Sequence, residues 1–211
     1  MPRGAAARPG QRRRAGQQGL AGGQMRPGPA LLAAPRLAFA FSDYALKERL
    51  CGRVCASHGR WLGGYRTLEL RPGGKRAGFE VEALGGGRAV LASREIVSPV
   101  SFNKYALDLA ALEGTALPAL EAAAAAGKVL LFDELGPMAM RSAAFSARAV
   151  ELLFSGSPCL VFFRRGAEVF EQAFARGGDT VIIELGEAGW AEAVAAADAW
   201  LDAKVRLMGT T

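Results

Sequence analysis

Short runs of consecutive apolar residues constrain the fold of this chain more than any other feature of its sequence. They occupy residues 37–41, 129–132 and 159–163, and residues 180–185 form a further run that includes Thr180 and Glu184. A strand buried on both faces reads as a continuous apolar run, whereas a half-exposed strand alternates apolar and polar residues. Segments with helical periodicity separate these runs, so the sequence predicts an α/β fold whose mostly parallel sheet is covered by helices on both faces.

The helical segments can be placed from their apolar spacing. The first begins after Ser42, a good N-cap residue, carries Leu46, Leu50 and Val54 four residues apart, and ends at Gly59. Further helices are predicted at 145–154, 169–174 and 190–207.

The stretch between the first two apolar runs follows a different pattern. Residues 61–70 and 75–82 flank the turn sequence 71–74 and predict a β-hairpin, to which residues 89–92 add a third strand. Residues 105–112 and 117–126 are predicted to be helical, the second because it is rich in alanine. The hairpin and its third strand are therefore expected to form an antiparallel β meander inserted into the parallel sheet.

The charge of the chain is divided unevenly along its length. The formal net charge is +6, but residues 1–36 hold seven arginines and no acidic residue, which leaves nineteen basic and twenty acidic residues in 37–211. We expect residues 1–36 to be a disordered basic tail and residues 37–211 to form one domain. The near-neutral body excludes a nucleic-acid-binding face built on the folded domain. For the tail, a transit segment, a twin-arginine export signal and a nucleic-acid-binding arm stay open, as does translation from Met25.

Cysteine content and hydropathy indicate a cytoplasmic protein. Three cysteines (Cys51, Cys55 and Cys159) give no disulfide framework, and the apolar runs are too short to span a membrane. Cys51, Cys55 and His58 share one helix face and would offer three metal ligands, but a structural zinc site needs four. Buried thiols in the core are the favoured interpretation.

Two acidic residues follow the run at 129–132. In open parallel sheets ligands bind beyond the carboxyl ends of the strands. Asp133 at this position can hold Mg²⁺ and Glu134 can orient or deprotonate an attacking water, although a solvated strand end is an equally simple interpretation. Arg164 and Arg165 follow the next run and could reach a phosphate, but a solvated pair is favoured.

Several motifs along the sequence, together with this acidic pair, carry a family resemblance. They comprise Gly63, Gly64, Tyr65, Thr67, Glu69 and Arg71; Arg76, Gly78 and Phe79; Lys104, Tyr105 and Asp108; residues 133–138; and Phe145. In order and spacing this set resembles the nucleoside-triphosphatase family of small P-loop proteins, known from thermophiles and as a human cancer-related form, across residues 37–185. The resemblance implies a P-loop NTPase-like fold, Mg²⁺-dependent hydrolysis of nucleoside triphosphates, and Asp133 and Glu134 as the metal-binding and catalytic residues of a Walker B strand. It further implies Lys47 as the lysine that contacts the β and γ phosphates, with Ser42, Arg71 and Arg76 as other nucleotide-binding candidates.

The phosphate loop departs from the family pattern. Where the family has G-x-x-x-x-G-K-[ST], Phe41 and Leu46 replace the glycines and Glu48 replaces the metal-binding hydroxyl. Asp43 adds a second negative charge, and each carboxylate near a triphosphate would cost on the order of 1 to 3 kcal/mol. Ala139 and the segment 186–190 depart from the family at further positions.

These departures predict weak or lost hydrolysis, with Mg²⁺ bound only if nucleotide binds. The alternative is a catalytically inactive relative that acts as a partner-binding or regulatory protein. A third hypothesis is that the cleft binds another small anion.

Overall fold

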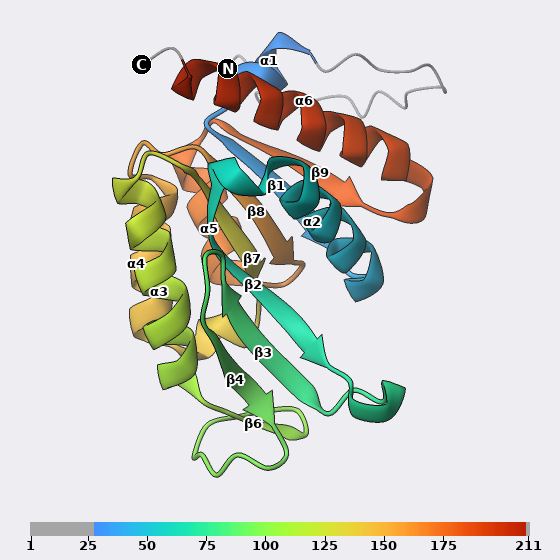
Figure 1. The fold of residues 1–211 in the computed structure, drawn as a ribbon, viewed down its shortest axis with the longest axis vertical. Coiled ribbons are helices and arrows are strands. Elements are labelled where there is room, and N and C mark those ends of the chain that lie inside the picture. The colour runs from blue at the N-terminus through green and yellow to red at the C-terminus, as the bar shows by residue number, and fades with distance from the viewer. Residues whose placement is uncertain (1–27, 210–211) are drawn as a thin grey trace, which may run out of the picture.

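A computed structural model describes residues 28–209 as a nine-stranded sheet with helices on both faces (Figure 1). The strands lie in the order β5-β6-β4-β3-β2-β7-β8-β1-β9. Their bounds are Arg36–Phe41 (β1), Leu62–Leu70 (β2), Gly78–Ala83 (β3), Arg88–Ser93 (β4), Ser101–Phe102 (β5), Tyr105–Leu107 (β6), Val129–Leu135 (β7), Cys159–Arg164 (β8) and Thr180–Leu185 (β9).

The sheet is parallel on one side of β2 and antiparallel on the other. Strands β2, β7, β8, β1 and β9 pair in parallel, whereas β3, β4, β6 and β5 continue from β2 as antiparallel neighbours. Strand β2 joins the two parts because its first half pairs with β7 and its second half with β3. The expected mostly parallel sheet with an antiparallel meander is thereby confirmed.

Two hydrophobic cores lie on opposite faces of the sheet. Helices α2 (Tyr44–His58) and α6 (Trp190–Met208) pack on one face, and α3 (Leu109–Ala125), α4 (Ala143–Leu153) and α5 (Glu168–Gly177) pack on the other. Strand β1 contributes to both: Leu37, Phe39 and Phe41 point to the first core, and Ala38 and Ala40 to the second. Burial on both faces explains why its sequence is continuously apolar.

The folded part begins before the predicted boundary at residue 37. Helix α1 (Pro29–Ala33) packs on α6, where Lys204 Nζ donates to Leu32 O at 2.9 Å and Trp200 Nε1 donates to Ala34 O at 2.8 Å. Arg36 is buried in β1, so residues 29–36 belong to the body rather than to the tail. The predicted disorder of the remaining tail falls on residues 1–27, outside the described residues.

The segment 105–112 was predicted as helix, which is wrong for its first three residues and confirmed for 109–112. Tyr105–Leu107 forms strand β6, which turns back from β5 at Asn103, a residue with a positive φ of 53°. One helix, α3, replaces the two predicted helices and contains Pro118 in its interior. Asparagine tolerates the left-handed conformation, and three residues are too few to reveal the strand's period of two.

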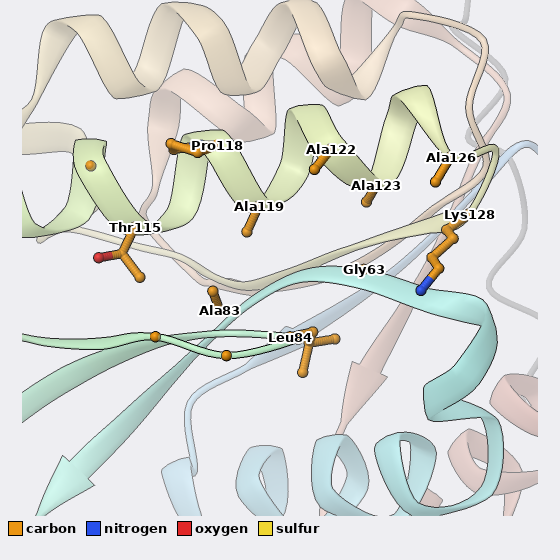
Figure 2. Close-up of a pocket in the computed structure, with 14 residues that line it drawn as sticks. Gly63, Ala83, Leu84, Thr115, Pro118, Ala119, Ala122, Ala123, Ala126 and Lys128 are labelled. Carbon is orange, nitrogen blue, oxygen red and sulfur yellow. The ribbon is translucent and has the colours of Figure 1, made fainter.

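A large groove on the surface lies away from all predicted site residues. It is an open groove of about 540 Å³ between α3 and the β3–β4 turn, lined mainly by glycine and alanine together with Lys128. Figure 2 shows Ala119, Ala122 and Ala123 pointing from α3 towards β2. Among residues 28–209, no helix is long and apolar enough to cross a membrane.

Candidate functional site

Strand β7 places the two acidic residues inside the sheet. All seven of its residues are buried, including Asp133 and Glu134, so the strand continues through the pair to Leu135 instead of ending before it. The register with β8 shifts between Asp133 and Leu135, which leaves Glu134 as an extra residue opposite β8. The carboxylates were expected at the edge of the sheet, but they lie within the fold.

Lys47 on α2 lies directly against Asp133. Its Nζ is 2.8 Å from Asp133 Oδ1, 2.6 Å from Glu48 Oε1 and 3.0 Å from Thr67 O, and its side chain is fully buried. The contact with Asp133 is a close ion pair without hydrogen-bond alignment. Burial opposes the charge, but Asp133 and the neighbouring Tyr44 and carboxylates outweigh it and hold the pKa of Lys47 well above its ordinary value.

The connection from β1 to α2 is a two-residue turn closed by Asp43. Asp43, and not Ser42, caps the helix: its Oδ1 accepts from Ala45 N at 2.8 Å and Leu46 N at 3.4 Å. The Asp43 carbonyl accepts from Lys47 N at 3.2 Å. These are amides that a phosphate bound at a helix N-terminus would use.

Glu134 is held through its backbone by β2. Thr67 Oγ1 accepts from Glu134 N at 3.3 Å, and Tyr65 Oη donates to Glu134 O at 3.0 Å. Burial raises the pKa of Glu134 to about 7, against the opposing effect of Lys47. A Cβ at Gly136 would lie 2.8 Å from Glu134 Oε1, so glycine at 136 leaves room for this carboxyl group.

The structure places the three other predicted nucleotide-binding residues in different surroundings. Arg76 and Glu134 line the same small cavity, although Arg76 also binds Glu69, with Nη1 to Oε1 at 2.8 Å. Arg71 pairs with the other oxygen of Glu69 at the exposed end of the hairpin, and it does not line that cavity. Ser42 is exposed in the turn before α2.

The helix face with the two thiols does not form a metal site. Cys51 is buried in the core, and His58 Nε2 lies 3.1 Å from Asp202 Oδ1 on α6. Within residues 28–209, no group of three or more His, Cys, Asp or Glu side chains is arranged to hold a metal ion.

Comparison with known proteins identifies the family. A family model described as NTPase matches residues 47–194, which is more than half of the chain. The chain belongs to this NTPase family. Its relatives include the nucleoside-triphosphatase THEP1 of Thermotoga sp. (strain RQ2), 30% identical over 125 residues that span 59% of this chain and 72% of that protein. The corresponding protein of Thermococcus kodakarensis is 34% identical over 126 residues, which span 56% of this chain and 70% of the relative.

Solved structures of the family share the fold. The crystal structure of THEP1 from Aquifex aeolicus superposes with a TM-score of 0.63 at 22% identity and covers 73% of this chain and 91% of its own. The solution structure of a human cancer-related nucleoside triphosphatase gives 0.62 at 22% identity, with coverage of 83% and 98%. These two structures confirm the predicted fold, and the family model confirms the predicted family. The family match begins at Lys47, after β1 and the turn that Asp43 closes.

Three residues near the site were not singled out as favoured candidates from the sequence. Arg164 at the end of β8 was interpreted as solvated, but its Nε lies 3.9 Å from Glu134 Oε1. Arg66 Nε lies 4.0 Å from Asp133 Oδ2, and Tyr44 places its ring 4.1 Å from Lys47 Nζ. The position of Arg164 at the carboxyl end of a strand next to β7 was the available signal.

Proposed function

We propose that this member of the NTPase family hydrolyses nucleoside triphosphates slowly or not at all, and that its fold serves as a binding protein. The observation that carries the proposal is the environment of Lys47. A lysine ammonium has three donors, and three protein oxygens already lie within 3.0 Å of Lys47 Nζ, two of them in hydrogen bonds and the third in the ion pair with Asp133.

Freeing this lysine for a phosphate is costly. Nucleotide binding through Lys47 requires separation of the buried pair with Asp133. The Asp133 carboxylate would then be buried without its partner, and such a loss costs about 3 to 5 kcal/mol. A cost of that size lowers the affinity by more than about 100-fold. The same contacts leave Asp133 facing an ammonium group where a metal ion would have to bind.

The turn before α2 supports the proposal independently of Lys47. A phosphate loop presents several free amides to the ligand, whereas here Asp43 occupies those of Ala45 and Leu46. The Asp43 carboxylate also repels a triphosphate at this position.

Asp133 does not fit Mg²⁺ in this arrangement. Its carboxylate lies between two cationic groups, Lys47 Nζ at 2.8 Å and Arg66 Nε at 4.0 Å. Mg²⁺ requires a near-octahedral set of oxygen ligands at about 2.1 Å. Glu48, where the family has a metal-binding hydroxyl, pairs with Lys47 instead.

Calorimetric titration with MgATP and MgGTP tests the proposal. We expect no saturable heat with the wild-type chain up to millimolar nucleotide. Micromolar binding that disappears in Lys47→Ala would overturn the proposal, because it would mean that Lys47 is free to contact phosphate.

Residual hydrolysis is a second candidate, favoured by the preserved grouping of Lys47, Asp133 and Glu134. Phosphate release would then be measurable with the wild-type chain, abolished in Glu134→Gln and unchanged in Glu187→Gln, a matched change at an exposed residue. Equal phosphate release by all three proteins would identify a contaminant and leave the first proposal standing.

A further inference from the structure

A small cavity beside Glu134 carries a further inference. Its volume is about 140 Å³, and it lies where the antiparallel hairpins meet the carboxyl ends of β7 and β8. We call it the Arg164 cavity. It is lined by Tyr44, Arg76, Phe79, Phe102, Asn103, Tyr105, Glu134, Pro137, Met138 and Arg164.

Tyr44 separates this cavity from the buried ion pair. Its ring lies over Lys47 Nζ on one side and packs edge-on against Phe79, 6.0 Å between centroids, on the other. Its hydroxyl group donates to Thr67 O at 2.5 Å, which fixes the ring. A ligand in the cavity therefore contacts Glu134 without displacing Lys47 from Asp133.

Two polar groups in the cavity have unused hydrogen-bonding capacity. Glu134 is only 7% exposed; its Oε2 is enclosed by protein, whereas Oε1, the oxygen beside Arg164, accepts no hydrogen bond among the described residues. Within the same part of the chain, the guanidinium of Arg164 donates no hydrogen bond; its Nε lies 3.9 Å from Glu134 Oε1. A buried acceptor without a donor is destabilising, and a ligand with a suitable donor would remove that cost.

The remaining walls favour a flat, unsaturated ligand. Phe79 and Tyr105 pack edge to face at 5.9 Å, and Phe102, Pro137 and Met138 complete an apolar lining. A volume of about 140 Å³ is well below the roughly 300 to 1,000 Å³ of sites for drug-sized ligands, so a nucleotide is too large.

We propose that the Arg164 cavity binds a small aromatic carboxylate whose amino or hydroxyl group lies on the ring carbon next to the acid. The acid would pair with Arg164 and the neighbouring donor with Glu134 Oε1. The short separation of Arg164 and Glu134 requires these two ligand groups to be adjacent. This inference rests on the proposed function in one respect, namely that Tyr44 and Lys47 keep their positions and leave the cavity to a small ligand.

Ortho-aminobenzoate is the probe, followed by its own fluorescence and by calorimetry. We expect saturable binding with a dissociation constant below about 1 mM. Para-aminobenzoate, which separates the two groups, and ortho-aminobenzamide, which lacks the charge, should each bind roughly 10-fold more weakly or worse. Equal binding of all three compounds, or of none, would overturn the proposal.

Arg164→Gln and Arg165→Gln form a matched pair of variants. Arg165 follows Arg164 directly but pairs with Glu184 outside the cavity. Loss of a hydrogen-bonded charge pair in Arg164→Gln should weaken binding by roughly 10-fold to 100-fold, and Arg165→Gln should bind as the wild type does. Similar losses in both variants would contradict the assignment.

Methyl-labelled methionine gives a readout that needs no variant to fold. Met138 lines the cavity, whereas Met208 lies near the end of α6. Saturation with ortho-aminobenzoate should shift the Met138 methyl resonance and leave Met208 unchanged. A Met138 signal that does not move would refute binding in this cavity. A titration of the same labelled protein with MgATP separates the two proposals. Nucleotide binding that is lost in Lys47→Ala would refute the proposed function but not the binding of ortho-aminobenzoate in this cavity.

Discussion

Glu134 illustrates at the scale of one residue how burial sets the protonation of the site. Its carboxyl group lies inside the sheet, one residue after an ion pair that neutralises Asp133. Because no hydrogen bond reaches Oε2 among the described residues, the charged form gains little to offset its lost hydration. The sequence indicated Glu134 as a functional residue, but the depth of its burial depends on the strand continuing to Leu135, which an acidic pair does not suggest.

The raised pKa of Glu134 makes stability depend on pH. The folded carboxyl group keeps its proton up to about pH 7, whereas the ordinary pKa of glutamate is 4.5, so the folded state binds more protons in between. The free energy of unfolding should therefore fall as pH rises through this window, by about 1.4 kcal/mol per pH unit at most. Glu134→Gln cannot titrate, so its stability relative to the wild type should rise by roughly 2 to 3 kcal/mol between about pH 5 and pH 8.

Urea denaturation of both proteins at the two pH values measures this change. Glu187→Gln, at an exposed position, serves as the control and should follow the wild type. A constant difference between Glu134→Gln and the wild type at both pH values would contradict the assigned pKa.

At the scale of elements, the strands with continuous apolar sequence were predictable and the short ones were not. Strands β1, β7 and β8 follow from apolar composition because two packed faces leave little room for polar residues. The edge strand β9 was also predicted from its apolar residues, although it is partly exposed. The pair β5–β6 is too short to display a period, and its turn depends on the backbone of Asn103. The same difference applies to the residues of the site. Asp133 and Glu134 lie on a predicted strand. Phe102 and Asn103, in contrast, reach the Arg164 cavity from the hairpin that was not predicted.

The pairing of β2 with β7 depends on Gly64. Its φ is +122°, and a Cβ there would lie 2.2 Å from Leu131 O, a backbone atom that cannot move without disturbing the sheet. Gly64→Ala should destabilise the protein by more than about 2 kcal/mol. Gly52→Ala is the matched control: no atom lies within 4 Å of the added Cβ on α2, and alanine should stabilise that helix by about 0.5 to 1 kcal/mol. Midpoints of thermal unfolding measure both, and a stable Gly64→Ala would show that β2 can shift away from β7.

At the scale of the whole molecule, the start of the described chain and the candidate site lie at different ends. The described chain begins at the end of the molecule away from the β5–β6 hairpin, with α1 on α6 (Figure 1). The candidate site lies at the carboxyl ends of the parallel strands, where β7 and β8 meet the hairpins. Composition predicted the division between a basic segment and a neutral body, but only the packing of α1 places the boundary before residue 29.

Removal of residues 1–27 tests whether the basic segment and the folded domain bind different ligands. Six arginines and no acidic residue lie in that segment, so the rest of the chain carries as many basic as acidic residues. We expect the full chain to bind labelled duplex DNA at low salt, with the logarithm of its affinity falling by about 0.9 per phosphate contacted for each tenfold rise in salt. A chain that begins at Gly28 should not bind the duplex, yet should bind ortho-aminobenzoate as the full chain does. Fluorescence anisotropy measures the first expectation. If the shortened chain bound DNA as tightly as the full one, a basic face on the folded domain would have to replace residues 1–27 as the source of that affinity.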